Sequence, residues 1–230
     1  MTKTLYIMAG CNGAGKTTAS MLLLPEKLDC TEFVNADEIA KGLSPFHPEE
    51  VAVQAGKLMV DRINLLVEGD KSFAVETTLS TKSYRLLIEK AHKKGFKVLL
   101  FFFRLPDAHR AIERVAQRVS EGGHNIPRDV IIRRFSAGLD NFSNIYKGIV
   151  DSWILIDNYS IPRVVLADGG LTDDERSRLI DGLEWAQHET LKRKAMRAEM
   201  VLQDNDNGEV VRVSARDVFE KLYSEPAPTF

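Results

Sequence analysis

The chain has 230 residues, with 31 lysines and arginines against 33 aspartates and glutamates, and its net charge of −2 argues against nucleic-acid binding. Its 44% hydrophobic share is ordinary for one sizeable folded domain, but the longest apolar run, residues 98–103, is far shorter than the about 20 residues that span a bilayer. Because the chain has only Cys11 and Cys30 and no apolar stretch typical of a secretory signal, we expect a cytoplasmic protein without disulfides or a paired-cysteine zinc site.

Short apolar runs alternate with helix-period stretches over the first 170 residues. This alternation is typical of βαβ units and predicts an α/β fold with a mainly parallel sheet. The run 98–103 lacks polar alternation, as expected for a central strand covered by helices on both faces. We predict strands at residues 5–9, 33–35, 73–76, 98–104, 153–156 and 164–167.

The helical patterns differ before and after residue 170. Residues 107–144 contain two helical patterns, the first with Asp107 as its N-cap, separated by Gly-Gly-His-Asn-Ile-Pro. Beyond residue 170 we predict a long helix over 172–200 with a break at Gly182, then a hairpin at Asp206-Asn207-Gly208 and a short helix capped by Ser214. We therefore expect a core at residues 1–170, with a helical lid at about 107–144, and a small helix and hairpin extension at 171–230 without recognisable chemistry.

The segment from Gly10 to Thr17 reads Gly-Cys-Asn-Gly-Ala-Gly-Lys-Thr and lies between a predicted strand and a predicted helix. It fits the phosphate-binding pattern G-x-x-x-x-G-K-[ST], in which backbone N–H groups at a helix N-terminus hold polyphosphate. Lys16 is expected to reach the β and γ oxygens and Thr17 to ligate Mg²⁺. Cys11 is interpreted as a tolerated small residue, the alternative being a reactive thiol whose pKa the positive loop lowers. The predicted nucleotide contacts are Gly10, Asn12, Gly13, Ala14, Gly15, Lys16, Thr17 and Thr18.

Carboxylates and hydroxyls follow two other predicted strands. The carboxyl ends of parallel strands form the ligand crevice of such a sheet. Asp37, after the second strand, is a candidate base for a substrate hydroxyl that attacks the γ-phosphorus, or else the N-cap of a helix beginning near Glu38. Glu76, Thr78 and Ser80 follow the third strand, where they are candidates for holding Mg²⁺-bound water or substrate hydroxyls, or are simply caps.

Arginines are frequent in the predicted lid. Arg114 and Arg118 are one helical turn apart, so both can face the same phosphate. In the second lid helix Arg134 flanks the apolar stripe whereas Arg133 points nearly opposite, so we prefer Arg134 for the cleft. A lid of this kind would exclude water and bring guanidinium groups to the phosphate, the alternative for any single arginine being an exposed helix face.

Four elements together resemble the zeta-toxin family of P-loop kinases: the glycine-rich loop, Asn-Ala-Asp-Glu-Ile-Ala at 35–40, Val-Glu-Thr-Thr-Leu at 75–79, and the Gly-Gly-His-Asn-Ile-Pro break followed by Arg-Arg-Phe at 133–135. The resemblance covers about residues 4–168. It implies a three-layer sandwich with a five-stranded, mainly parallel sheet, ATP or GTP with Mg²⁺ as the phosphoryl donor, and a hydroxyl of a small molecule as the acceptor. Some members phosphorylate UDP-N-acetylglucosamine, so the resemblance also implies a UDP-sugar acceptor and a protein antitoxin as partner.

The family pattern, together with the lid arginines, gives a set of expected roles. Catalysis is assigned to Asp37, Lys16, Arg118 and Arg134. Contact with the acceptor is assigned to Asp37, Glu76, Thr78, Ser80, Arg114 and His124, and metal binding to Thr17 and Glu76. Two positions depart from the family. Ser80 stands where zeta toxins tend to carry an arginine. The second lid arginine of the family is displaced in this sequence, and His124 is the residue nearest to its usual position.

Two other functions compete with this one. The first is a nucleotide switch or motor subunit acting through a protein partner. The sequence has no separate strand of four apolar residues ending in Asp, the usual Walker B pattern, so Glu76 or Asp157 would serve as its carboxylate. The second is a polynucleotide-end kinase, which the arginines favour and the net charge opposes. The sequence leaves open the acceptor, the choice between ATP and GTP, toxicity and the oligomeric state.

Overall fold

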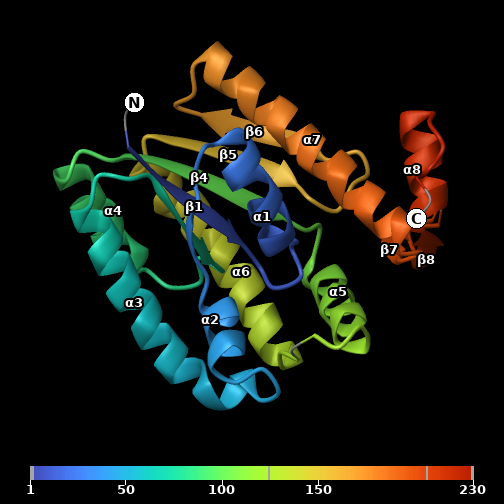
Figure 1. Cartoon of the computed structure of the whole chain (residues 1–230), viewed down its shortest axis with the longest axis horizontal. Helices are drawn as coiled ribbons and strands as arrows, with labels where there is room; N and C mark the ends of the chain where they lie inside the picture. Colours follow the sequence, from blue (N-terminus) through green and yellow to red (C-terminus); the bar gives the residue numbers. More distant parts are fainter. Residues whose placement is uncertain (1–2, 124, 206, 229–230) are drawn as a thin grey trace.

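The computed structural model describes residues 3–123, 125–205 and 207–228 of the chain. Its main sheet has six strands in the order β2-β3-β1-β4-β5-β6 (Figure 1). These are β1 (Thr4–Gly10), β2 (Glu32–Val34), β3 (Phe73–Thr77), β4 (Lys97–Arg104), β5 (Ser152–Asp157) and β6 (Val164–Gly169). The predicted strands and their mainly parallel pairing are confirmed, but the sheet has a sixth strand that the five-stranded expectation lacks. The connection from β5 to β6 is too short for a crossover helix, so β6 pairs antiparallel with β5.

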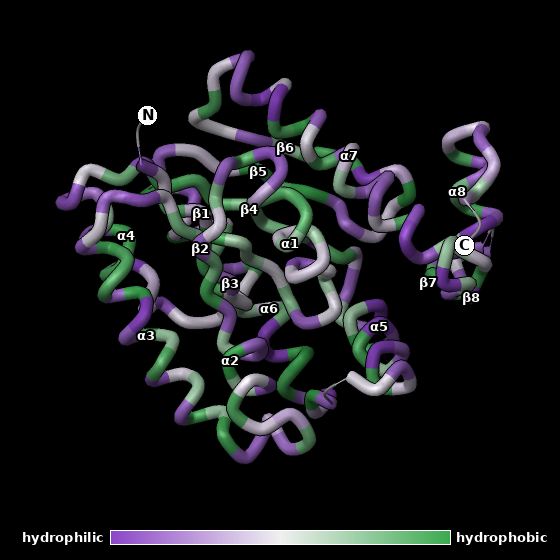
Figure 2. The backbone as a smooth tube through the Cα atoms, in the orientation of Figure 1, coloured by the Kyte–Doolittle hydropathy of each residue, from purple (hydrophilic) through white to green (hydrophobic). Residues whose placement is uncertain are grey.

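Helices cover both faces of the sheet and make three layers (Figure 1). They are α1 (Lys16–Lys27), α2 (Ala36–Leu43), α3 (Ala52–Glu68), α4 (Tyr84–Lys93), α5 (Ala108–Ser120), α6 (Arg128–Asn144), α7 (Asp173–Met196) and α8 (Ala215–Tyr223). Along β4, Leu99, Phe101 and Phe103 join the core beneath α1 and α7, while the alternate Leu100 and Phe102 join the core beneath α3 and α4. The central strand is therefore apolar on both faces, as predicted, and Figure 2 shows green strands at the centre of the molecule.

The sheet register determines where the polar residues meet. Met8 of β1 pairs with Glu76 of β3, and Gly10 pairs with Phe103 of β4. Because β1 to β5 are parallel, the loop after β1, the start of α2 after β2 and the end of β3 open at the same edge of the sheet. This edge carries the glycine-rich loop, Asp37 and Glu76.

The C-terminal segment packs against this core through α7, which lies along α1 (Figure 1). Thr172 forms a capping box with Glu175 at the start of α7. The helix runs without interruption through Gly182, so the predicted break there is wrong. A Cβ atom at Gly182 would lie 2.9 Å from Leu23 Cδ1 of α1, which shows that this glycine serves the close approach of the two helices.

Replacing Gly182 with valine is expected to lower the free energy of unfolding by about 1–3 kcal/mol, because the added atoms overpack the α1–α7 contact. Gly56→Val in α3 is the matched control, since a Cβ atom at Gly56 meets no described atom within 4 Å. Urea unfolding of both variants measures the difference. Equal stability of the two variants would contradict the packing role of Gly182.

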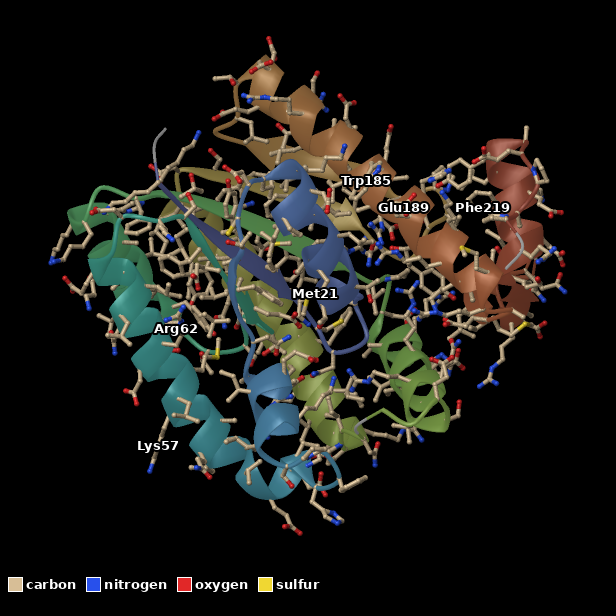
Figure 3. The ribbon with its side chains drawn as sticks, viewed as in Figure 1. Met21, Lys57, Arg62, Trp185, Glu189 and Phe219 are labelled. Atoms are coloured by element: carbon tan, nitrogen blue, oxygen red, sulfur yellow. The ribbon has the colours of Figure 1, made fainter. Side chains whose placement is uncertain are left out.

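The rest of the C-terminal segment forms a small second sheet and α8. β7 (Met200–Asp204) and β8 (Val210–Ser214) pair antiparallel, which confirms the predicted hairpin, although Asp206 of its turn lies outside the described residues. The Ser214 hydroxyl accepts a hydrogen bond from the Asp217 backbone and caps α8, as predicted. Phe219 of α8 points toward α7 (Figure 3), and its ring centroid lies 5.2 Å from that of His188.

The division of the chain at residue 170 stays a prediction. The side chains beyond it have a small apolar cluster of their own around Phe219, and α7 also contributes Leu179 and Leu183 to the core beneath α1. None of the helices in the described ranges combines the length and hydropathy that a bilayer span requires.

Candidate active site

The glycine-rich loop between β1 and α1 is held from two sides. Gly13 and Gly15 adopt positive φ angles of 79° and 76°. A Cβ atom at Gly15 would lie 2.6 Å from Asn158 Nδ2, and one at Gly13 would lie 2.9 Å from the Ala111 carbonyl oxygen of α5. Glycine is therefore needed both for the curled backbone and for the close approach of α5 and of the segment after β5. The loop presents its N–H groups at the start of α1, which is the geometry of an anion site.

Glu76 is the centre of a polar cluster at the end of β3. Its carboxylate accepts hydrogen bonds from Thr17 Oγ1 at 2.9 and 3.1 Å and from Asn35 Nδ2 at 2.9 Å. Lys16 Nζ lies 3.5 Å from the carboxylate, and both side chains are almost fully buried. Lys16 also donates to the Cys11 carbonyl oxygen at 3.0 Å. Two separate strand ends and the glycine-rich loop thus meet at one carboxylate.

The residues around Glu76 fit a magnesium ion. Mg²⁺ is usually held by one or two protein oxygens, with phosphate oxygens and water completing its shell. The Thr17 hydroxyl and the Glu76 carboxylate provide such a pair, and both face the cavity described below. Within the described ranges there is no group of three or more His, Cys, Asp or Glu side chains suited to a metal.

Asp37 lies in the first turn of α2. The cap of this helix is Asn35, whose Oδ1 accepts a hydrogen bond of 2.8 Å from the Asp37 backbone N–H. The alternative role of Asp37 as N-cap is therefore wrong, because the helix begins at Ala36, two residues earlier than the sequence suggests. The Asp37 side chain is exposed, and among the described residues its carboxylate has neither a hydrogen bond nor an ion pair. It is available to a ligand.

A cavity of about 540 Å³ joins these groups. Ten of the predicted site residues line it: Asn12, Gly13, Gly15, Lys16, Thr17, Thr18, Asp37, Glu76, Arg114 and Arg118. Five others are described but do not line it: Gly10, Ala14, Thr78, Ser80 and Arg134. His124 lies outside the described residues.

The predicted residues outside the cavity have other contacts. Thr78 and Ser80 hydrogen-bond to each other through their hydroxyls at 2.9 Å, and their role as acceptor contacts stays a prediction. Gly10 ends β1, and the fully buried Ala14 accepts a hydrogen bond from Asn158 Nδ2 at 2.5 Å through its carbonyl oxygen. Arg134 Nη1 donates to Asn12 Oδ1 at 3.3 Å, so its side chain turns toward the glycine-rich loop, and its place in the cleft stays a prediction.

The two arginines of α5 both reach the cavity. Arg114 Nη1 donates to the Asn158 carbonyl oxygen at 3.0 Å, and its guanidinium lies over the Tyr159 ring, 5.0 Å from the centroid. Burial lowers the pKa of Arg114 from its ordinary value. Arg118 follows one turn later along the same helix and lines the same cavity. The structure therefore brings both arginines to the cavity beside the glycine-rich loop.

Two alternative roles from the sequence fail. Cys11 is buried, and desolvation raises the pKa of its thiol to about 11, so the expectation of a lowered pKa is wrong. Asp157 accepts hydrogen bonds from the backbone N–H groups of Tyr159 and Ser160 and holds the turn after β5. It is absent from the cavity lining, whereas Glu76 contacts Thr17 directly.

Sequence reasoning missed one wall of the cavity. It assigned no chemistry to residues after 170 and none to the turn after β5. That wall consists of Asn158, Ser160, Ile161 and Arg163 after β5, Gln187, Thr190, Leu191 and Lys194 of α7, and Met200, Val201 and Leu202 of β7. No motif marks these positions. The segment after β5 reaches the glycine-rich loop through Asn158, which donates to the Ala14 carbonyl oxygen, and the residues of α7 reach it because α7 packs on α1.

Arg110 ties the first lid helix to β7. It forms ion pairs with Asp107 and, at 2.6 Å, with Asp204. Asp204 also accepts a hydrogen bond from Tyr159 Oη at 2.8 Å. The side-chain hydrogen bond from Arg110 is the largest cause of a lowered pKa at Asp204. The C-terminal hairpin is thus attached to the lid by an ion pair.

Replacing Asp204 with asparagine is expected to destabilise the protein at pH 7 by less than about 1 kcal/mol, because the ion pair is partly exposed. A lowered pKa contributes stability that is present above the ordinary carboxyl pKa of about 3.9 and is lost as the pH falls through the folded-state value. The stability gap between the wild type and Asp204→Asn should therefore close toward pH 3. Thermal unfolding at several pH values measures it, and a gap independent of pH would contradict the ion pair.

A glycine-rich loop after the central strand of a parallel sheet, with a hydroxyl and a carboxylate paired beside its lysine, defines a P-loop kinase-like nucleotide-binding protein. The family model described as zeta toxin matches residues 1–160, and the chain belongs to the zeta-toxin family. An uncharacterised protein of Haemophilus influenzae is 28% identical over 141 residues, which cover 58% of this chain and 98% of that protein.

Solved structures share the fold. The AvrRxo1-ORF1:-ORF2 structure with ATP has a TM-score of 0.59 and 20% identity, and the match covers 80% of this chain and 64% of that one, so this chain spans less than two thirds of that protein. The structure from the PezAT chromosomal toxin–antitoxin system of Streptococcus pneumoniae has a TM-score of 0.52 and 17% identity. The match covers 83% of this chain and 88% of that one.

Proposed function

We propose that this protein is a phosphotransferase that moves the γ-phosphoryl group of Mg²⁺-bound ATP or GTP to a hydroxyl of a small molecule, with UDP-sugars as the acceptor class to test first. The observation that carries this proposal is the convergence of the glycine-rich loop, the Thr17–Glu76 pair and the unpaired Asp37 carboxylate on one cavity. Family membership supports nucleotide binding and a kinase-like reaction.

The proposed mechanism assigns each group a task. The loop N–H groups and Lys16 bind the phosphates, and Thr17 and Glu76 would hold Mg²⁺, which neutralises charge on the bridging oxygen when bound. Asp37 accepts the proton of the acceptor hydroxyl as that oxygen bonds to the γ-phosphorus and the bond from phosphorus to the β–γ bridging oxygen breaks. Arg118 and Arg134 stabilise the negative charge of the transferring group, so catalysis is mainly positioning and electrostatics.

The decisive experiment mixes purified protein and Mg²⁺ with ATP or GTP and a panel of UDP-sugars, nucleosides and free sugars. We expect mass spectrometry to find one acceptor class that gains a phosphoryl group with the wild type and not with Lys16→Ala. Hydrolysis without any phosphorylated acceptor would contradict the proposal and favour the nucleotide switch.

We infer in addition that the protein has a neutralising protein partner. The inference is supported by the PezAT toxin–antitoxin system and by the two-component AvrRxo1-ORF1:-ORF2 complex among the similar structures. Expression of the wild type without its neighbouring genes should slow the growth of a bacterial host, whereas Lys16→Ala should not. Equal growth with both would contradict the inference.

A further inference from the structure

One face of α6 connects two parts of the candidate active site. Arg134, Gly138 and Asn141 follow one another at steps of four and three residues, so they lie on the same face of the helix. At one end of this face Arg134 Nη1 donates to Asn12 Oδ1 of the glycine-rich loop at 3.3 Å. At the other end Gly138 and Asn141 contact the segment between β3 and α4, residues 78–83, which we call the β3–α4 turn. A single helix therefore contacts both the glycine-rich loop and the turn that follows the candidate metal site.

The contacts between α6 and the β3–α4 turn are close and buried. A Cβ atom at Gly138 would lie 2.5 Å from the Thr78 carbonyl oxygen, so glycine is needed for the helix to approach the turn this closely. Asn141 is 9% exposed, and its Nδ2 donates to the Leu79 carbonyl oxygen at 2.9 Å. Two successive carbonyl groups of the turn thus face α6, one in van der Waals contact and one hydrogen-bonded.

The β3–α4 turn has a backbone conformation that needs such support. Leu79 has a φ angle of 57°, in the left-handed region that side chains other than glycine rarely adopt. Its side chain is fully buried in the core beneath α3 and α4, and its N–H donates to Thr77 Oγ1 at 2.9 Å. Just beyond α6, Tyr146 Oη donates to the Thr81 carbonyl oxygen at 2.7 Å. Strained backbone persists only where its surroundings hold it, and Asn141 supplies the bond to the strained residue itself.

The hydroxyls that are predicted to contact the acceptor belong to this turn. Thr78 and Ser80 are linked to each other by a hydrogen bond of 2.9 Å. Glu76, which lines the cavity, lies two residues before Thr78 in the chain. The conformation of the turn therefore sets where these hydroxyls lie relative to Glu76. Group transfer is sensitive to such placement, since a displacement of about 1 Å can lower the rate about 100-fold.

We propose that Asn141 is a positioning residue for phosphoryl transfer, which holds the β3–α4 turn through the Leu79 carbonyl group and so places the acceptor against the terminal phosphate. Asn141 does not line the cavity and acts only through the turn. Arg134 attaches the same face of α6 to the glycine-rich loop, so α6 sets the spacing between acceptor and donor. The proposal rests on the proposed function, because it takes the turn to contact an acceptor hydroxyl.

The test replaces Asn141 with leucine, which keeps a branched side chain but has no N–H donor. With the acceptor that the panel of UDP-sugars, nucleosides and free sugars identifies, the KM for the acceptor should rise and kcat/KM should fall about 10–100-fold. The ratio of nucleotide hydrolysed to acceptor phosphorylated should rise, because a misplaced acceptor lets water compete for the phosphoryl group. The Kd of Mg²⁺-bound nucleotide should stay within about twofold. Asn144→Leu, at an exposed position of α6, is the matched control and should match the wild type.

A second variant keeps the proposal falsifiable if Asn141→Leu folds poorly. Tyr146→Phe removes only the hydroxyl that bonds to the Thr81 carbonyl oxygen and keeps the buried ring, so it should shift the acceptor KM and the hydrolysis ratio in the same direction by smaller factors.

An unchanged acceptor KM and an unchanged hydrolysis ratio in both variants would overturn the proposal even if kcat fell, because a smaller folded fraction lowers kcat alone. A loss of nucleotide affinity as large as the loss of kcat/KM would overturn it as well, since α6 would then act on the donor side. A wild type that phosphorylates no acceptor would refute the proposed function and this inference with it. A wild type that transfers the phosphoryl group, with variants that match it, would refute this inference alone.

Discussion

Replacing Asp37 with asparagine is expected to lower kcat for phosphoryl transfer by about 10²–10⁴-fold, because the amide cannot accept the proton of the acceptor hydroxyl. The Kd of Mg²⁺-bound nucleotide should stay within about twofold, since Asp37 bonds to none of the described residues through its carboxylate and stands apart from the Lys16–Glu76 pair. Single-turnover kinetics with the acceptor found in the panel, together with calorimetry, measure the two quantities separately.

Asp61→Asn is the matched control for this variant. Asp61 is an exposed carboxylate of α3 that does not line the cavity, so the same substitution there should leave kcat unchanged. A kcat of Asp37→Asn within tenfold of the wild type would show that another group takes the proton. A loss of nucleotide binding in that variant would show that Asp37 acts on the donor side of the cavity.

Replacing Glu76 with glutamine is expected to change, above all, the Mg²⁺ concentration that the activity requires. The amide keeps an oxygen for the Thr17 hydroxyl but loses the charge that would face Mg²⁺, so the Mg²⁺ concentration for half-maximal activity should rise by about 10–100-fold. It also leaves Lys16 without its carboxylate partner in a buried site, which should cost about 1–3 kcal/mol of unfolding free energy. Activity titrations with MgCl₂ and urea unfolding measure these effects.

The same substitution at Glu26, an exposed residue of α1 outside the cavity, is the matched control. It should alter neither the Mg²⁺ concentration for half-maximal activity nor the free energy of unfolding. An unchanged Mg²⁺ dependence in Glu76→Gln would remove Glu76 from the metal site. Of the proposed pair, Thr17 alone would then bind Mg²⁺.

Much of the fold follows from local patterns in the sequence. The unbroken apolar run of β4 predicts a strand buried on both faces, and its alternate residues do enter two different cores. The glycine-rich loop and its lysine identify the phosphate site because their spacing encodes backbone geometry within a few residues. Local chemistry was less decisive at α2, where Asn35 and Asp37 are both good caps and only the structure shows that Asn35 holds the helix.

Features that depend on distant packing could not be predicted in this way. Gly182 looks like a helix breaker in sequence, yet it lies inside α7 because α1 passes close to it. Gln187 belongs to no motif, and it reaches the cavity because α7 packs against α1. The expectation that Thr78 and Ser80 contact the acceptor rests on the strand end and on the family resemblance, and it stays a prediction; in the structure their hydroxyls bond to each other.

A crystal structure of the protein with Mg²⁺ and a non-hydrolysable ATP analogue tests the central claim most directly. We predict phosphates on the N–H groups of residues 11–17 and the terminal phosphorus between Lys16 and Asp37. A nucleotide bound elsewhere, or one whose terminal phosphorus points toward β5 and away from Asp37, would contradict the account.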